Sequence, residues 1–343
     1  MVEAGRLSRE LSGPGFNVLE RVRDTIARFD MLPGDAPCVV AVSGGPDSLC
    51  LLDILGRLKV RPLVVAHVDH GLSPASDDAA TGVARLAAEA GFDVHVARAH
   101  DLAGPNLHAR ARAFRYSFFN TIARDAGADR IATGHTLDDR VETTLARLIH
   151  GGGTSVLAGL RPMDGPRVRP LIALRRAETR RYCDERELPY VVDDANDDPR
   201  FERARVRNEL VSAIEKHWGD GAVRAIATSI ERLSEDATAL EGIVDSLYPS
   251  LAEVGDDGTR FDQQALRGMP RAVQRRLLER AVGRVRDRAG GIDAALEALT
   301  RELPGDGVRF SVASGIEIAI DRERVLVTQV GDGDSSGRSG ERG

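Results

Sequence analysis

Short apolar runs alternate with longer amphipathic stretches over the first half of the chain. The runs are short enough for buried strands, and each following stretch repeats its apolar positions at helical spacing. Four such strand–helix units in series predict a parallel sheet with helices on both faces, whose strand ends meet along one ligand-binding edge. The predicted strands are 37–42, 62–68, 93–98 and 129–133, and the helices that follow them are 47–58, 76–91, 106–126 and 137–150.

The remaining pattern is mainly helical and ends in strands. A helix is expected near 16–30, and a short apolar run lies at 168–172. Further helices are predicted at 175–187, 199–216, 221–248, 262–268, 270–287 and 292–300, and strands at 307–312, 315–320 and 323–329. We therefore expect an N-terminal extension (1–34), an α/β domain (35–216), a mainly helical domain with a small C-terminal β segment (217–330), and a disordered tail (331–343).

Composition is that of an ordinary globular protein. The chain has 343 residues, of which 42% are hydrophobic and 29% charged, enough for two domains. No stretch approaches the length of a membrane span and the N-terminus lacks an apolar signal core, so we expect a cytoplasmic protein without a membrane partner. The three cysteines, Cys38, Cys50 and Cys183, form no CxxC pair and are expected to be small core residues.

The net charge of −6 argues against an RNA partner until its distribution is considered. Residues 161–181 hold seven arginines against two acids, and residues 267–288 hold eight against two. Arginine suits bidentate contacts with phosphate, so these runs are candidate RNA-binding surfaces. The alternative is that the arginine bias reflects only the base composition of the genome.

A glycine turn joins the first predicted strand to its helix. Free backbone N–H groups and the positive end of the helix dipole face an anion there, and the two glycines allow phosphate to approach closely. No lysine is present, so the turn is not a Walker A loop. An acid at this place would repel phosphate unless a metal ion lay between them, which suggests ATP with Mg²⁺. The alternative is an ordinary strand–helix turn capped by Ser43. The residues are Ser43, Gly44, Gly45, Pro46, Asp47 and Ser48.

Polar clusters also follow the other predicted strands. The second strand ends in His67–Leu72, for which ordinary turn chemistry is an equal alternative. The helix 106–126 carries Arg112 and Arg115, which share a face at i and i+3 but also suit a solvated surface. His135, Asp139 and Glu142 project on one side if the fourth helix begins at His135, and could then hold Mg²⁺ and move protons. Acids at a helix N-terminus also simply suit the dipole.

Together these strings resemble the PP-loop ATP pyrophosphatase superfamily, with its adenine nucleotide alpha hydrolase-like fold, and within it the tRNA(Ile)-lysidine synthetase family. The resemblance covers about residues 37–216 and continues more weakly to about 330. One departure is Thr136, where the family commonly has a second histidine. The motifs that carry the resemblance are His67–Leu72, Ala111–Tyr116, Ala132–Thr143, Leu157–Pro162, Arg169–Leu171, Tyr182–Glu185, Asp193–Asn196 and Pro199–Arg207.

The resemblance implies a ligase that adenylates the wobble cytidine of an isoleucine tRNA with ATP and then attaches L-lysine to its ring carbon 2. It implies catalytic roles for Asp47, His135, Asp139, Arg115 and Glu142, with Mg²⁺ on Asp47 and Asp139. Nucleotide binding is expected from residues 43–48, His67 and Arg112. The expected tRNA contacts are Arg175, Arg176, Arg203, Arg205, Arg207, Arg275 and Arg276.

Two other functions remain open at this point. A related tRNA enzyme that thiolates a base generally needs reactive cysteines or an iron–sulfur cluster, and three scattered cysteines argue against it. A non-catalytic RNA-binding module would be indicated by loss of Asp47 or His135, and both are present. The oligomeric state stays open, with a homodimer as one candidate.

Overall fold

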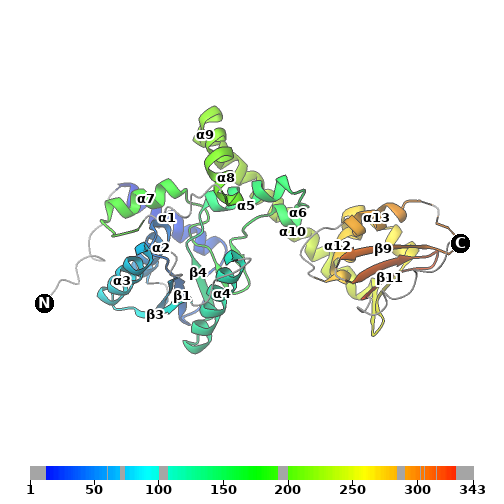
Figure 1. The fold of residues 1–343 in the computed structure, drawn as a ribbon, viewed down its shortest axis with the longest axis horizontal. Helices are drawn as coiled ribbons and strands as arrows, with labels where there is room; N and C mark the ends of the chain where they lie inside the picture. The colour runs from blue at the N-terminus through cyan, green and yellow to red at the C-terminus, as the bar shows by residue number, and fades with distance from the viewer. Residues whose placement is uncertain are drawn as a thin grey trace, which may run out of the picture. The chain divides into compact units, whose positions relative to one another are not determined.

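The computed structural model describes most of the chain, in two compact units. The units are Met1–Ser234 and Glu235–Gly343, and helix α10 (Asp220–Leu251) runs through the division (Figure 1). The predictions for residues 70–72, 193–196, 199 and 331–343 lie outside the described residues. The described residues are 13–59, 61–69, 74–99, 107–191, 200–283, 290–301, 303–304, 306–313 and 315–329.

The first unit is built on a six-stranded sheet in the order β3-β2-β1-β4-β6-β5. All neighbouring pairs are parallel except β5 with β6, and Val40 of β1 aligns with Val65 of β2 and Ala132 of β4. The four predicted strands are confirmed as the first four of this sheet. The strands are β1 (Cys38–Ala41), β2 (Leu63–Asp69), β3 (Asp93–Arg98), β4 (Arg130–Thr133), β5 (Met163–Asp164) and β6 (Arg167–Val168).

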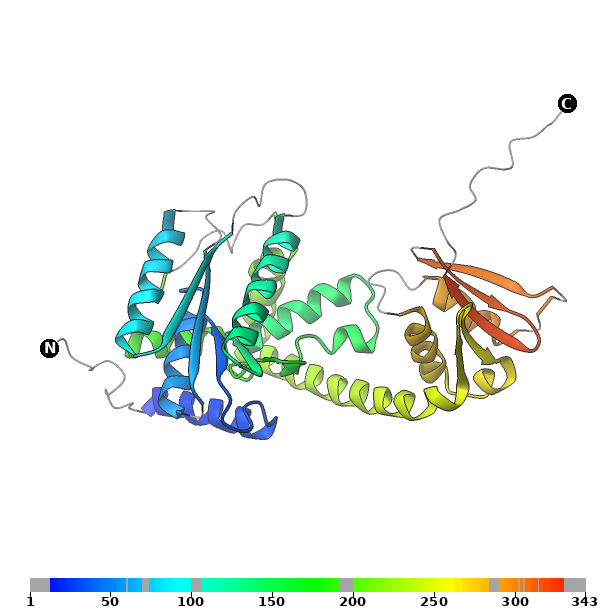
Figure 2. The ribbon, with the colours of Figure 1, turned by 90° about the horizontal axis from the view of Figure 1, so that it is seen from below.

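Helices cover both faces of this sheet, as predicted (Figure 2). Residues of α1, α2, α3 and α7 pack with Val40 and Val65 on one face, whereas Phe119 and Ile122 of α4 pack with Val39 on the other. The helices of this unit before α10 are α1 (Gly13–Arg28), α2 (Pro46–Leu58), α3 (Pro74–Glu89), α4 (Leu107–Asp125), α5 (Leu137–Ile149), α6 (Thr154–Leu157), α7 (Arg176–Glu185), α8 (Glu202–Arg205), the π-helix η2 (Val206–Val211) and α9 (Ser212–Trp218).

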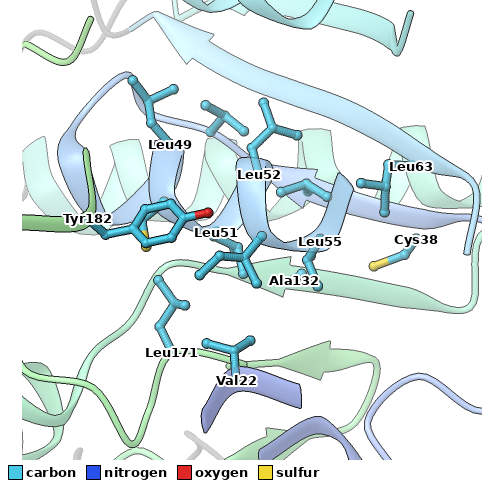
Figure 3. Close-up of a cluster of buried hydrophobic side chains, with 14 of the residues drawn as sticks. Val22, Cys38, Leu49, Leu51, Leu52, Leu55, Leu63, Ala132, Leu171 and Tyr182 are labelled. Atoms are coloured by element: carbon cyan, nitrogen blue, oxygen red, sulfur yellow. The ribbon is translucent and has the colours of Figure 1, made fainter. Parts of the chain in front are cut away.

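The core beneath the glycine turn holds α2 in place (Figure 3). Leu51 and Leu55 of α2 are fully buried, and Tyr182 of α7 lies against this helix with 1% of its surface exposed. The Tyr182 hydroxyl donates to Asp53 Oδ2 at 2.5 Å, so the one polar atom of this ring is satisfied. Helix α7 is thereby fixed beside the start of α2, which places its N-terminal residues near the turn.

A second cluster places the segment 202–211 above α5. Leu137 and Val141 of α5 pack with Val206 and Val211 of η2 and with Val223 of α10. The single helix predicted over 199–216 is therefore wrong in detail, because its described part is divided into α8, η2 and α9. A π-turn of this kind is rare and often marks a functional site.

The second unit is an antiparallel five-stranded sheet, in the order β7-β8-β11-β10-β9, packed with helices. The three predicted C-terminal strands are confirmed, but the sequence reasoning missed β7 and β8. The stretch Gly255–Gly258 is the turn between these two strands. The elements are β7 (Ala252–Gly255), β8 (Gly258–Asp262), α11 (Gln263–Arg267), α12 (Arg271–Val282), α13 (Gly290–Ala298), β9 (Val308–Ala313), β10 (Ile316–Ile320) and β11 (Arg324–Gln329).

Candidate functional site

The glycine turn has the geometry of an anion cradle. Gly44 has a φ of +88°, which a residue with a side chain rarely adopts, and Gly45 caps the N-terminus of α2. Ser48 Oγ accepts from Ser43 N at 3.1 Å and donates to Gly45 O at 2.9 Å, so the two serines hold the turn closed. Val191 N donates to Gly44 O at 3.0 Å from outside the turn. Pro46 occupies the first turn of α2, where its missing N–H costs nothing.

Asp47 is a half-buried carboxylate at the start of α2. Its Oδ1 accepts from the Thr179 hydroxyl, and its Oδ2 lies 3.7 Å from Arg176 Nε. Burial raises the pKa of Asp47 to about 6, and Asp139 adds to this effect, whereas Thr179 and Arg176 oppose it. The carboxylate is therefore mostly ionised at pH 7 and sensitive to mild acid.

The junction between β4 and α5 lies directly against this turn. A side chain at Gly134 would place its Cβ 3.1 Å from backbone atoms of Asp47 and Ser48, so glycine permits the contact. Thr136 is the N-cap of α5 and forms a reciprocal capping box with Asp139. Thr136 N donates to Asp139 Oδ2 at 2.7 Å. The helix therefore starts at Leu137, and the condition that it begin at His135 is not met.

Asp139 and Glu142 are buried on α5 and paired with three arginines. Asp139 Oδ1 accepts from Arg176 at 2.8 Å and from Arg203 at 2.7 Å. Glu142, only 1% exposed, accepts from Arg176 at 2.9 Å, from Arg203 at 3.2 Å and from Arg207 at 2.9 Å. We call this group, with Asp47, the carboxylate–arginine cluster. Its three acids and three arginines balance in charge.

The arginines decide the protonation of these two acids. Burial alone would raise the pKa of Asp139, but Arg203 and Arg176 outweigh it and hold that pKa at about 2. Burial likewise opposes Arg176 and Arg207 at Glu142, whose pKa is lowered. Both carboxylates are therefore ionised at neutral pH, and the arginines neutralise their negative charges.

Both predicted histidines are buried enough to be neutral at pH 7. Burial lowers the pKa of His135 to about 4, and Arg169 and Arg203 add to the shift against the opposing charge of Asp139. Its Nδ1 lies 2.8 Å from Thr133 Oγ1. His67 is 2% exposed, and burial lowers its pKa too. Its Nδ1 lies 2.7 Å from Val42 O, while its buried Nε2 has no partner in the described part of the chain.

Arg112 and Arg115 lie on α4 beside Tyr116. The guanidinium carbon of Arg112 is 4.9 Å from the centre of the Tyr116 ring, and that of Arg115 is 6.0 Å away. Burial lowers the pKa of Arg115, and its neighbours Arg112 and Arg203 add to the effect. The two arginines that the sequence places on one helix face are thus brought together.

The arginines expected to bind tRNA fall into different environments. Arg175 is 6% exposed and bonds to three acids, Asp138, Glu215 and Asp220, so its donors serve the fold. Arg176, Arg203 and Arg207 are committed to the carboxylate–arginine cluster in the same way. Arg205 is exposed. In the second unit, Arg275 pairs with Asp293 at 2.5 Å and the buried Arg276 with Glu241 at 3.4 Å. A contact of these residues with tRNA stays a prediction. The geometry of Arg175 does not support such a contact for that residue.

Four functional contacts were missed by the sequence reasoning. Thr179 bonds Asp47, and Arg176 contacts Asp47, Asp139 and Glu142, although Thr179 and Arg176 lie more than 120 positions from Asp47. No local signal points to these contacts. Thr136, by contrast, begins the string Thr-Leu-Asp-Asp, which fits the N-cap pattern in which a hydroxyl residue is followed three positions later by an acid.

Comparisons with known proteins agree with this geometry. A family model described as a PP-loop domain matches residues 19–214. A curated tRNA(Ile)-lysidine synthase of Gloeobacter violaceus is 37% identical over 258 residues, which cover 73% of this chain and 78% of the relative. The synthase of Solibacter usitatus is 36% identical over 77% of this chain, but only 60% of that relative is covered.

A solved structure shares the fold. The U34-tRNA thiolase NcsA from Methanococcus maripaludis superposes with a TM-score of 0.51 at 22% identity, over 64% of this chain and 79% of that one. No described helix is both long and apolar enough to span a bilayer. The family match spans more than half of the chain and the curated relatives most of it, as the sequence motifs predicted. The chain therefore belongs to the PP-loop family and, within it, to the tRNA(Ile)-lysidine synthase family.

Proposed function

We propose that this protein ligates L-lysine to ring carbon 2 of the wobble cytidine of an isoleucine tRNA with a CAU anticodon. The observation that carries the proposal is the 36–38% identity to curated tRNA(Ile)-lysidine synthases over 70% or more of the chain. The similarity extends beyond the ATP-binding domain, because an alignment of 330 residues covers 87% of the chain. ATP, tRNA and lysine are then the substrates.

The reaction has two steps. In the first, the 2-oxo oxygen of cytosine attacks the α-phosphorus of ATP, and the bond to the leaving pyrophosphate breaks. In the second, the ε-amine of lysine attacks ring carbon 2, and the bond from that carbon to oxygen breaks as AMP departs. The amine loses a proton, so a nearby base is needed.

The glycine turn is suited to the first step. Its backbone N–H groups and the N-terminus of α2 face the position where pyrophosphate gains charge. Two carboxylates, Asp47 and Asp139, share Arg176 as a counter-ion, and oxygen donors of this kind are the ligands that Mg²⁺ takes together with phosphates. We assign these two residues to hold Mg²⁺, which would displace Arg176 from between them and, when bound, would neutralise charge on the phosphates. Arg115 is assigned to the α-phosphate.

His135 is better placed than Glu142 to accept the proton of the amine. Both oxygens of Glu142 accept from arginines, so neither is open to a proton from the amine. His135 is neutral at pH 7, and Thr133 engages only its Nδ1. The imidazole Nε2 is therefore the nitrogen we assign to proton transfer, and Glu142 becomes a residue that positions arginines.

Thiolation is disfavoured by the cysteines. All three cysteines of the chain are buried and free, and burial raises the pKa of Cys38 and of Cys183 to about 12 and that of Cys50 as well. A thiol with a raised pKa is a weak nucleophile and a weak metal ligand at neutral pH. The likeness to the thiolase NcsA is thus one of fold.

The decisive test is incorporation of labelled lysine into a transcript of isoleucine tRNA with a CAU anticodon. We expect incorporation that needs ATP and releases one pyrophosphate per lysine. A methionine tRNA transcript with the same anticodon should accept none, and Asp47→Asn should abolish pyrophosphate release while tRNA still binds. Pyrophosphate release that ignores both tRNA and lysine would refute the proposal.

A further inference from the structure

A group of arginines surrounds one tyrosine beside the carboxylate–arginine cluster. Tyr116 on α4 has the guanidinium carbon of Arg167, from β6, 4.6 Å from its ring centre, and that of Arg112 at 4.9 Å. Arg115 is at 6.0 Å, and Arg169 lies close enough to Tyr116 for the two to interact electrostatically. We call these five residues the Tyr116 cluster. They come from two segments about 50 residues apart, and the sheet and α4 bring them together.

Positive charge in the Tyr116 cluster exceeds its negative charge. Asp164 pairs with Arg167 at 3.1 Å and lies 4.0 Å from Arg169. In the described part of the chain, Arg112 and Arg115 contact the Tyr116 ring but pair with no carboxylate. Burial lowers the pKa of both Arg115 and Arg169, and neighbouring arginines add to the shift at each, whereas Asp164 opposes it at Arg169. An anion bound here would relieve this cost.

The arginines also have donors to offer. Arg169 is 4% exposed, and the buried Nε atoms of Arg167 and Arg169 have no partner among the described residues. A guanidinium that stacks its face on an aromatic ring keeps its N–H edge free for a phosphate oxygen. Unpartnered buried donors are costly and call for a ligand.

The Tyr116 cluster adjoins the reaction site. Arg112 and Arg169 both act on the pKa of His135, which directly precedes the cap of α5. Arg203, which bonds Asp139, is also close enough to act on Arg115. A ligand seated on the Tyr116 cluster would therefore lie next to the groups proposed to act on the cytidine. The proposed binding site for the pyrophosphate of ATP is the separate turn at residues 43–48.

We propose that Arg112, Arg167 and Arg169 of the Tyr116 cluster bind a phosphodiester of the anticodon loop beside the target cytidine, which leaves Arg115 to the α-phosphate of ATP. The proposal moves Arg112 from the nucleotide site expected from the sequence to the RNA. This inference rests on the proposed function. Single-stranded RNA is bound by arginines on its phosphates and by aromatic or guanidinium planes on its splayed bases, and the Tyr116 cluster supplies both. Arg112 is exposed, so it is open to an incoming RNA strand.

The test compares Arg112→Gln, Arg167→Gln and the double variant with Arg124→Gln. Arg124 lies on the same helix, is 74% exposed at its side chain, and pairs only with its neighbour Asp125 among the described contacts. Binding of the full isoleucine tRNA transcript is measured over a series of salt concentrations, without ATP or lysine. Binding of ATP alone is measured in parallel, and melting curves confirm the fold.

We expect the double variant to bind tRNA at least tenfold more weakly, with a salt slope reduced by about 0.7 for each phosphate that the variant no longer neutralises. ATP affinity should stay within twofold, and Arg124→Gln should match the wild type. Weaker ATP binding with unchanged tRNA binding would assign the Tyr116 cluster to the nucleotide and overturn the inference. Unchanged binding of both would also overturn it.

Two features keep the test independent and complete. If the double variant fails to fold, the exposed single variant Arg112→Gln decides between the same outcomes. Lysine incorporation by the wild type is scored separately. A protein that binds tRNA through the Tyr116 cluster yet transfers no lysine would contradict the proposed function and not this contact.

Discussion

Replacing Glu142 by glutamine tests whether the carboxylate–arginine cluster stabilises the fold. The change keeps the size of the side chain but removes the negative charge that Arg176, Arg203 and Arg207 face. Removing one partner of a buried ion pair costs roughly 3–5 kcal/mol. Arg176 and Arg203 keep Asp139, so we expect the lower end, about 3 kcal/mol. For a unit of this size that corresponds to a fall in Tm of roughly 6–12 °C.

The assay is calorimetric melting of wild type, Glu142→Gln and a matched control at pH 7.5. Glu209→Gln is the control, because Glu209 lies in the π-helix beside Arg207 and is exposed. It makes the same change in net charge without removing a buried partner. We expect the control to melt within 2 °C of the wild type, since exposed substitutions usually change stability by about 0.5 kcal/mol or less.

The pH dependence of the difference provides a second check. The pKa of Glu142 is lower in the folded protein than its ordinary value of 4.5, so its stabilisation is full above pH 4.5 and declines as the pH falls below that. The gap between wild type and Glu142→Gln should therefore narrow in acid. A gap under 2 °C at pH 7.5, or one that does not change down to pH 4, would refute the reasoning.

Three further predictions concern the turn and its neighbours. Because the pKa of Asp47 in the free enzyme is raised to about 6, we expect kcat/KM for pyrophosphate release to fall about tenfold per pH unit below 6, and an unchanged kcat/KM at pH 5 would contradict this. The same raised pKa means that ionised Asp47 destabilises the folded state above pH 6. Asp47→Asn should therefore raise the free energy of unfolding at pH 7 by roughly 1–3 kcal/mol while it stops adenylation, and a lower Tm would contradict this. Gly134→Ala should lower kcat for pyrophosphate release at least tenfold, because its Cβ would press on the backbone of Asp47. The control Gly82→Ala, with open space around it, should leave kcat unchanged. Equal kcat values for the two variants would refute the close contact.

Three of the first four strands, β1, β2 and β4, were predictable because both faces of the sheet are covered there. Every residue of β2 is buried, and its first four residues form a continuous apolar run that a hydrophobicity pattern detects. The hairpin of β7 and β8 is different, because Val254 is 74% exposed and only Thr259 and Phe261 of β8 are buried. Its one local signal was Asp257-Gly258, a pair typical of tight hairpin turns.

Only those parts of the candidate site that lie close together in the sequence could be predicted. The turn at 43–48 and the acids of α5 follow strands, and parallel strands put their ends on one edge. The arginines that pair with those acids come from α7 and from the segment 202–211. No local sequence pattern there indicates these distant partners. Arginines predicted to face RNA are therefore found bonded to Glu142 and Asp139.

In the π-helix η2, the number of residues in the turn matters more than which residues they are. Six residues, Val206–Val211, are wound into one wide turn shortly after Arg203, and Arg207 lies within it. Deleting a single residue there, such as Asn208, would let the turn return to the ordinary α-helical pitch and would move Arg207, whose guanidinium bonds Glu142. A one-codon deletion in this turn should thus be far less tolerated than a point substitution at the same place, and libraries of insertions and deletions would reveal the difference.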